Sequence, residues 1–280
     1  MPDTSQWFTE TSDATGSGFA LRVRRKLHEE QSRYQKIEIY ETTDWGNLMV
    51  IDDCIMLTTR DNFLYHEMMS HPALFTHPDP KRVVIIGGGD CGTLREVLRH
   101  PGVQQVTQID IDERVTRLSE TYFPELCESN DDPRAELLFI DGIKWMQQAE
   151  AASIDVIIVD STDPVGPGEV LFSEEFYRAC HDALQPDGLI VQQSESPLLH
   201  RALLKRIRHD MVSAGFAGTR TLQFPQPVYP GGWWSATMAM SLSAWPEPRY
   251  AEMGKIAGMR YFNRAIFDAS LALPAFMTEE

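Results

Sequence analysis

The chain has 280 residues, 42% hydrophobic and 24% charged, ordinary proportions for a globular protein with a buried core. It carries 25 Lys and Arg against 41 Asp and Glu, a formal net charge of −16, which disfavours nucleic-acid binding and suits cationic small molecules. The sequence shows no signal pattern, no membrane-length apolar run and no paired cysteine motif, so we expect a cytoplasmic protein with reduced thiols that binds neither membrane nor nucleic acid.

Residues 1–60 combine a polar start with short alternating segments. Residues 1–18 are rich in Ser, Thr and Gly, with Trp7 and Phe8 as the only obvious apolar anchors. Over residues 19–57 apolar and polar residues alternate in short runs, which Asp-Trp-Gly-Asn interrupts as a hairpin signal. We therefore expect a small antiparallel β-domain, on which the basic residues within 22–26 form a solvated face rather than a polyanion site.

A single helix is expected to follow this β-domain. The segment 61–75 predicts the helix, and Pro-Asp-Pro directly after it marks a domain boundary. The expected division is an N-terminal β-domain with its linking helix, residues 1–76, and a larger second domain, residues 77–280. The helix contains His66 and His71, but the zinc motif HExxH needs its histidines four positions apart, so no metal site is expected.

A glycine-rich turn comes next, between a predicted strand and a predicted helix. The apolar, β-branched run 83–86 suits a strand buried on both faces, and apolar residues recur at helical spacing over 94–98. Residues 87–92 between them read Gly-Gly-Gly-Asp-Cys-Gly, a turn through which backbone and a helix N-terminus can approach a nucleotide. Asp90 would repel a pyrophosphate, so the turn favours a cationic ligand such as an adenosyl sulfonium over NAD. The alternative is a turn that only packs the helix against the strand.

Strands and helices alternate through the following residues, which is typical of a parallel sheet whose ligands bind beyond the carboxyl ends of the strands. The expected strands are 104–112, 135–141, 154–160 and 188–195, and the expected helices end near residue 122 or span 143–151, 172–184 and 198–214. The strand ends carry four carboxylates and an amide: Asp90, Asp110, Asp141, Asp160 and Gln193. One Asp after a strand is commonly a helix N-cap, but four on one rim of an acidic chain predict a site for a cation. Asp110 also stands where an acidic residue accepts hydrogen bonds from ribose.

Several motifs are spread over nearly the whole chain: YQKIEIYET, TTRDNFLYHEMMSH, VVIIGGGDCGTLREVLRHPGV, DID, DG at Asp141, VDSTDPVGPGE, QQSES and PQPVYPGGWW. They resemble those of the polyamine aminopropyltransferases, the family of the spermidine synthases. The resemblance implies a Rossmann-like, methyltransferase-type α/β fold with a mostly parallel sheet and a small N-terminal antiparallel β-domain, assembled as a homodimer or homotetramer. It implies aminopropyl transfer from decarboxylated S-adenosylmethionine, a co-substrate, to an amine, commonly putrescine, giving spermidine and methylthioadenosine without a cofactor or metal.

The resemblance also implies roles for individual residues. Asp160 would be the general base, with Tyr65 beside the attacking nitrogen. Asp90 would hold the primary amine of the donor, Asp110 its ribose and Asp141 its adenine amino group. The residues implied for the donor are Gln35, His66, Gly87, Asp90, Asp110, Asp141 and Gly142. The residues implied for the amine acceptor are Tyr65, Asp160, Asp163, Gln193 and Tyr229.

The sequence leaves several alternatives open. An amine N-methyltransferase using intact S-adenosylmethionine and a non-catalytic polyamine-binding protein are the competing functions. Residues 161–172, rich in Pro and Gly, would form a lid whose order without ligand is open. Met56 stands where some relatives place an amine-binding glutamine, which leaves open the choice among putrescine, cadaverine, agmatine and spermidine.

Overall fold

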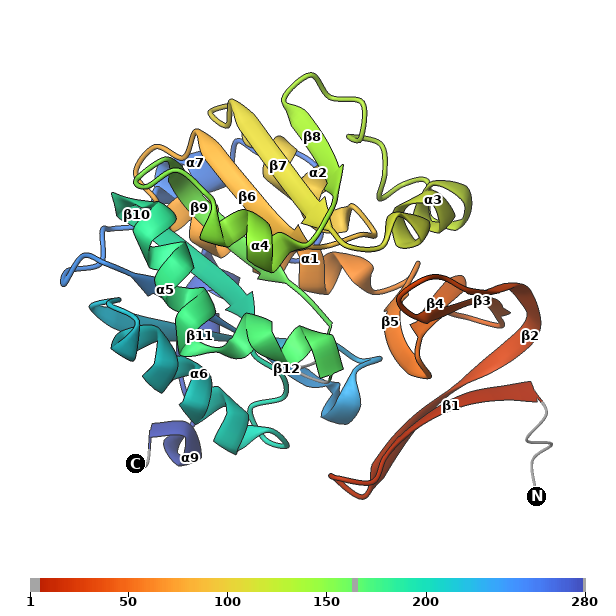
Figure 1. The fold of residues 1–280 in the computed structure, drawn as a ribbon. Helices are drawn as coiled ribbons and strands as arrows, with labels where there is room; N and C mark the ends of the chain where they lie inside the picture. The colour runs from red at the N-terminus through yellow and green to blue at the C-terminus, as the bar shows by residue number, and fades with distance from the viewer. Residues whose placement is uncertain (1–5, 163–165, 279–280) are drawn as a thin grey trace.

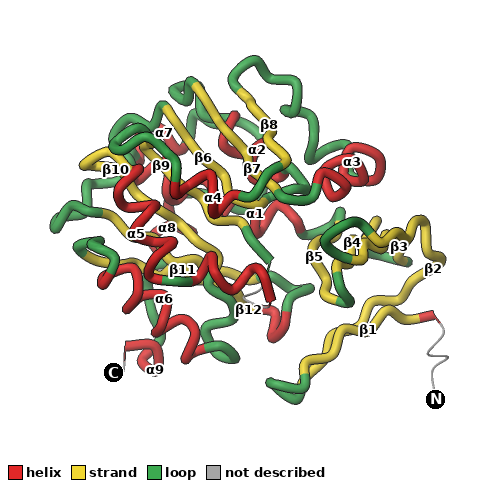
Figure 2. Tube along the Cα trace, in the orientation of Figure 1, coloured by secondary structure: helices red, strands yellow, loops and turns green. Residues whose placement is uncertain are grey.

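Two β-sheets organise the structure (Figure 1). This computed structural model describes residues 6–162 and 166–278. A five-stranded sheet comes first in the chain, and a seven-stranded sheet with flanking helices follows it. Figure 2 shows the contrast: the first part is almost entirely strands and turns, whereas the second alternates strands with helices. The arrangement confirms the predicted fold class, a mostly parallel α/β sheet with a small antiparallel β-domain.

The small sheet is antiparallel throughout, with its strands in chain order. They are β1 (Trp7–Ser12), β2 (Ser17–Gln31), β3 (Lys36–Thr42), β4 (Asn47–Ile51) and β5 (Cys54–Thr58). The sequence analysis placed no strand within residues 1–18, yet Trp7 pairs with Arg22 across a β1–β2 hairpin. Alternate threonines, which suit strands, explain this pairing in a segment with little apolar character. The basic side chains of residues 22–26 are exposed, as expected for a solvated face.

The large sheet has the order β11–β12–β10–β9–β6–β7–β8. Its strands are β6 (Arg82–Gly87), β7 (Gln105–Asp110), β8 (Ala135–Phe139), β9 (Ile154–Asp160), β10 (Leu184–Gln193), β11 (Gly218–Pro225) and β12 (Trp233–Met240). Five neighbouring strands run parallel, as predicted: β10, β9, β6, β7 and β8. β12 pairs antiparallel with β10 and β11, an edge that the sequence analysis did not predict. A short connection that holds only a 3-10 helix, η3 (Pro230–Gly232), joins β11 to β12, so the chain returns in the opposite direction.

Helices cover both faces of the large sheet. β6 shows the result: Val83 and Ile85 pack in one core cluster with residues of α1 and α2, and Val84 and Ile86 pack in another with residues of α4, α5 and α6. The helices are α1 (Asn62–Thr76), α2 (Gly92–Leu98), α3 (Glu113–Tyr122), α4 (Gly142–Gln147), α5 (Glu174–Ala183), α6 (Arg201–Ser213), α7 (Tyr250–Met253), α8 (Arg264–Ser270) and α9 (Ala275–Thr278), with 3-10 helices η2 (Gly166–Phe172) and η3 (Pro230–Gly232). Over residues 6–162 and 166–278, no helix has both the length and the apolar character to cross a membrane.

The helix α3 joins the two sheets. Its residues Val115 and Leu118 belong to one core cluster with Ile37, Ile39 and Met49 of the small sheet. Because α3 begins three residues after β7 ends, this packing places the small sheet beside the carboxyl edge of the large one. Side chains of both sheets therefore border the space beyond that edge.

A buried carboxylate on α1 holds the C-terminal segment. Glu67 is only 1% exposed. Its oxygens accept three backbone N–H groups, those of Arg260 at 2.7 Å, Tyr261 at 2.8 Å and Phe262 at 2.7 Å. Phe262 and Phe267 then pack in the same core cluster as α1 and strands of the large sheet, so the apolar C-terminal segment lies on that sheet.

Removing this carboxylate should destabilise the fold. We expect Glu67→Ala to lower the free energy of unfolding by about 3 kcal/mol, because each buried donor left without a partner costs about 1–3 kcal/mol. The shift in the midpoint of urea unfolding, followed by circular dichroism, measures the effect. The control is Glu113→Ala on α3, which removes a half-exposed ion pair with Arg117 that contributes less than about 1 kcal/mol. Equal shifts for the two variants would contradict the anchoring role of Glu67.

Candidate active site

The glycine-rich turn, residues 87–92, makes close contacts with side chains and backbone of other segments. β6 ends at Gly87, whose φ of +85° is a conformation that glycine adopts readily. A Cβ atom on Gly87 would lie 2.1 Å from the carbonyl oxygen of Asp160, and one on Gly92 would lie 2.2 Å from the ring of His66. Only glycine fits at these two positions, and the close approach brings α1, β9 and the start of α2 together.

Asp160, the last residue of β9, accepts a hydroxyl hydrogen bond at each carboxylate oxygen. The hydroxyl of Tyr65 on α1 donates to Oδ1 at 2.7 Å, and that of Thr93 on α2 donates to Oδ2 at 2.6 Å. Burial raises the pKa of Asp160, the charge of Asp90 raises it further, and His66 and the two hydroxyls oppose this rise without cancelling it. A carboxylate with a raised pKa accepts a proton more readily than an ordinary aspartate.

Asp90 and His66 form a buried pair. Oδ2 of Asp90 lies 3.2 Å from Nε2 of His66, and Oδ1 accepts the backbone N–H of Gly92 at 2.7 Å. Burial raises the pKa of Asp90, but His66 and this N–H outweigh burial, so the pKa lies below its ordinary value. Burial lowers the pKa of His66, but the Asp90 carboxylate outweighs it and raises that pKa. Asp90 therefore carries its negative charge at neutral pH.

A cavity of about 380 Å³ opens at the carboxyl edge of the large sheet. Four strand-end aspartates are among its lining residues: Asp90, Asp110, Asp141 and Asp160. Five other residues that the resemblance implied for the donor or acceptor also line it: Gln35, Tyr65, Gly87, Gly142 and Tyr229. The small sheet contributes apolar wall through Met49 and Ile51. A cavity of this volume accommodates a nucleoside-sized ligand.

The outer aspartates of this cavity differ in environment. Burial raises the pKa of Asp110 to about 6. The carboxylate of Asp141 caps α4, accepting two backbone N–H groups of its first turn. Gln35 reaches the cavity from the loop between β2 and β3, and its Nε2 donates to Oδ2 of Asp112 at 3.1 Å. Asp110 and Asp141 thus offer oxygens to hydrogen-bond donors of a ligand from two neighbouring strand ends.

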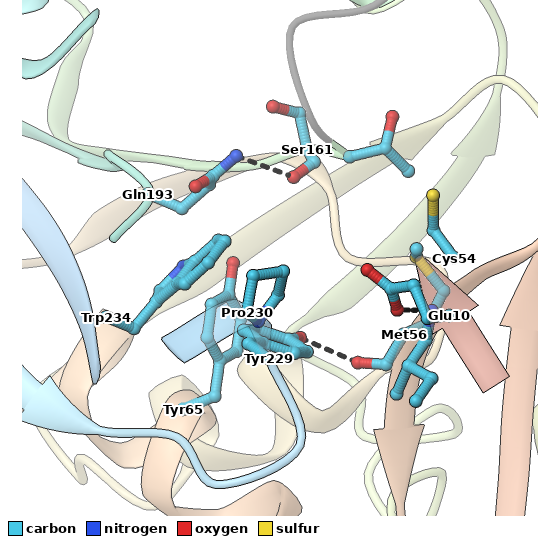
Figure 3. A pocket seen from close by; sticks show the side chains of 11 residues that line it. Glu10, Cys54, Met56, Tyr65, Ser161, Gln193, Tyr229, Pro230 and Trp234 are labelled. Carbon is cyan, nitrogen blue, oxygen red and sulfur yellow. Dashed lines mark hydrogen bonds between the residues drawn. The ribbon is translucent and has the colours of Figure 1, made fainter. Parts of the chain in front are cut away.

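A second cavity, of about 40 Å³, shares Tyr65 and Tyr229 with the larger one (Figure 3). The hydroxyl of Tyr229 donates to the carbonyl oxygen of Met56 at 2.6 Å. Gln193 lines this small cavity and not the larger one, and its Nε2 donates to the carbonyl oxygen of Ser161 at 3.4 Å. Gln193 thus stands on the same carboxyl edge as the aspartates, as predicted, because β10 runs parallel to β9 and Gln192 pairs with Val159, but it borders a different cavity from theirs. β10, which ends at Gln193, is the direct neighbour of β9, which ends at Asp160, and β6 and β7 lie beyond β9.

Comparison with known proteins assigns the chain to a family. Residues 6–59 match the spermidine synthase tetramerisation domain, and residues 62–245 match the spermine/spermidine synthase domain. The chain belongs to the spermine/spermidine synthase family. As a member of this family it is an enzyme, an aminopropyltransferase, as the resemblance implied.

Individual relatives of this synthase agree with the assignment. The polyamine aminopropyltransferase of Methylococcus capsulatus is 59% identical over 276 residues, covering 99% of this chain and 97% of that protein. That of Xanthomonas oryzae pv. oryzae is 64% identical over 239 residues, covering 85% and 84%. A spermidine synthase solved with the transition state analogue AdoDATO superposes with a TM-score of 0.93 at 35% identity, covering 99% and 95%. The synthase of Thermotoga maritima gives 0.91 at 35% identity, covering 99% and 94%.

The described residues include only part of the predicted lid, residues 161–172. Asp163 lies outside the described residues, and residues 166–172 of the predicted lid form the 3-10 helix η2.

Within the described residues, no group of three His, Cys, Asp or Glu side chains is arranged to hold a metal ion. The two histidines of α1 point to different partners, His66 to Asp90 and His71 to Glu96 and His100 in the core.

The sequence analysis missed two residues of the site. Thr93 bonds Asp160, and Glu10 on β1 lines the small cavity, where its Oε2 accepts the backbone N–H of Ile55 at 2.7 Å. Thr93 follows the glycine turn as an ordinary first-turn helix residue, and Glu10 belongs to a strand that was not predicted. Trp234 also lines the small cavity.

Proposed function

We propose that this synthase transfers the aminopropyl group of decarboxylated S-adenosylmethionine to putrescine, giving spermidine and methylthioadenosine. The observation that supports this most is the bonded pair of Asp160 and Tyr65, in which Tyr65 lines both cavities. A relative with the same fold over 99% of this chain is a spermidine synthase that binds AdoDATO. We assign the larger cavity to the nucleoside donor and the smaller one to the amine.

In the proposed donor site, each aspartate contacts a different part of the donor. Asp141 holds the adenine amino group, Asp110 accepts from the ribose hydroxyls, and the ionised Asp90 attracts the primary ammonium of the aminopropyl arm. The carboxylates match a ligand that carries a sulfonium and an ammonium and has no phosphate. Gly87 and Gly142 let the backbone approach the ligand closely, while Gln35 and His66 complete the site.

The proposed reaction is a single displacement. The nitrogen lone pair of the amine attacks the carbon beside the sulfonium, the new C–N bond forms as the C–S bond breaks, and neutral methylthioadenosine leaves with the bonding electrons. An alkylammonium has a pKa of roughly 10, so the amine arrives charged and must lose a proton. Asp160 first binds this cation and then takes the proton, a role that its raised pKa favours. Tyr65 fixes the carboxylate from α1.

The proposed amine site combines apolar surface with polar ends. Tyr65 and Asp160 hold the attacking nitrogen, Gln193 and Tyr229 complete the groove, and Asp163, outside the described residues, is assigned to the amine on the resemblance. Met56 offers a thioether to the methylene groups of the amine. Glu10, which the sequence analysis missed, supplies a carboxylate in the same small cavity for the second ammonium of a diamine.

The assembly and organisation of the synthase are part of the proposal. We propose a homotetramer built through residues 1–76, supported by the match of residues 6–59 to a tetramerisation domain. Residues 77–280 would be the catalytic domain. We propose the cytoplasm as its location on the sequence argument alone.

A product assay tests the function. Purified protein is incubated with decarboxylated S-adenosylmethionine and, in parallel, putrescine, cadaverine, agmatine or spermidine, and methylthioadenosine is quantified. We expect putrescine to give the highest turnover, with spermidine as the second product. Adenosylhomocysteine formed from intact S-adenosylmethionine would instead indicate an amine methyltransferase. Tight donor binding without product from any amine would indicate a binding protein and overturn the proposal.

A further inference from the structure

Asp160 is held by two neutral hydroxyl groups from two different helices. Tyr65 comes from the first turn of α1, and Thr93 is the second residue of α2, directly after the glycine turn. Their O–H groups bond opposite oxygens of the carboxylate, at 2.7 Å and 2.6 Å. A carboxylate has about four acceptor positions, so each oxygen keeps one for a substrate N–H. The two bonds fix the plane of the carboxylate and leave it able to accept from an ammonium.

Thr93 is placed to make this bond without adjustment. Its side chain is fully buried, with 0% exposure. The start of its helix is fixed by Asp90, whose Oδ1 accepts the N–H of Gly92, and the backbone carbonyl of Thr93 accepts from the hydroxyl of Ser70 on α1. The hydroxyl of Thr93 therefore meets Asp160 from a rigid part of the backbone, on the side opposite to Tyr65.

We infer that Thr93 is a positioning residue for the general base: its hydroxyl sets the orientation and the basicity of Asp160. The inference rests on the proposed function, because it assumes that Asp160 accepts the proton of the amine. Hydrogen bonding to the ionised carboxylate stabilises that form, so Thr93 lowers the proton affinity of Asp160. Without it, Asp160 would remain protonated to a higher pH and would be free to rotate about its Cα–Cβ and Cβ–Cγ bonds.

The other groups around Asp160 define the direction of the expected change. The titratable groups that face it are Tyr65 and His66 on α1, Asp90 in the glycine turn and Asp110 at the end of β7. Burial and Asp90 raise the pKa of Asp160, whereas His66, Thr93 and Tyr65 lower it. Removing the Thr93 hydroxyl leaves the raising influences in place, so the pKa of Asp160 rises further.

The test compares Thr93→Val, which keeps the branched shape without the hydroxyl, with Thr93→Ser, which keeps the hydroxyl. The first readout is kcat against pH at saturating decarboxylated S-adenosylmethionine and putrescine. We expect the acid limb of Thr93→Val to move to higher pH by roughly one unit, the size expected for loss of a hydrogen bond to a charged group. At pH values below this limb, the turnover of Thr93→Val should accordingly be about tenfold lower than that of the wild type, with an unchanged KM for the donor. Thr93→Ser should keep the acid limb of the wild type.

A second readout needs no turnover. pH-difference infrared spectroscopy follows the protonated carboxyl band of Asp160, which is assigned by its loss in Asp160→Asn. The band should titrate at higher pH in Thr93→Val than in the wild type or in Thr93→Ser. An unmoved titration in Thr93→Val overturns the inference, and so does a Thr93→Ser variant that behaves like Thr93→Val. If the wild type forms no methylthioadenosine, the proposed function fails, and the infrared titration still decides whether Thr93 sets the basicity of Asp160.

Discussion

Asp160→Asn should reduce methylthioadenosine release by about 10²- to 10⁴-fold at neutral pH, the contribution typical of a positioned general base. The amide occupies the same space as the carboxylate but can neither take the proton of the amine nor balance its charge. The contacts proposed for the adenosine come from Asp110 and Asp141 and not from Asp160. The donor should therefore bind the variant with nearly unchanged affinity. Turnover by product assay and donor affinity by calorimetry measure the two effects separately.

The pH dependence of this variant gives a sharper test than its activity at one pH. As the pH approaches roughly 10, a growing share of the free amine has already lost its proton. The base then becomes dispensable, so the deficit of Asp160→Asn should shrink steadily with rising pH. A deficit that stays constant across this range would show that Asp160 acts through shape or charge alone.

A matched control lies on the same strand. Asp155→Asn changes a carboxylate near the opposite end of β9, where Oδ2 accepts the backbone N–H groups of Lys81 and Arg82 at 2.8 Å. This variant reports any general effect of an amide on β9. We expect it to retain turnover within a few-fold of the wild type. Wild-type turnover in Asp160→Asn would rule out the proposed base.

The carboxyl edge of the sheet could be predicted from sequence because it depends on the order of elements alone. When each buried β-branched strand is followed by Asp and then a helix, the aspartates lie at the same end of the parallel sheet, however the side chains pack. The structure accordingly has Asp90, Asp110, Asp141 and Asp160 around one cavity. Their chemical roles remain predictions.

Other features could not be predicted because they depend on contacts between distant segments. The bond from Thr93 to Asp160 spans 67 positions of the chain, and nothing local to either residue indicates it. Glu10 reaches the small cavity only because β1 folds back along β2 in a polar hairpin. The sequence also assigned His66 and Asp90 separately to the donor, whereas the structure pairs them with each other.

The pairing of Asp90 with His66 bears directly on how the synthase selects its donor. His66 keeps the carboxylate ionised, so Asp90 presents a fixed negative charge to the cavity. Intact S-adenosylmethionine carries a carboxylate that the decarboxylated donor lacks. If that group lies about 4 Å from Asp90, the repulsion costs about 4 kcal/mol at an effective dielectric constant near 20, about a thousandfold in affinity. Decarboxylated donor should therefore be strongly preferred.

Asp90→Ala should narrow this preference by up to about a thousandfold, because it removes the repulsion felt by the intact compound and the attraction felt by the decarboxylated one. Asp90→Asn tests the same charge while retaining an oxygen for the N–H of Gly92, so agreement between the two variants separates charge from loss of the helix cap. The measured quantity is the ratio of the dissociation constants of the two sulfonium compounds. Asp141→Asn is the matched control: it weakens both compounds at their shared adenine end and should leave the ratio unchanged. If the ratio is the same in the wild type and both Asp90 variants, selection of the donor does not depend on Asp90.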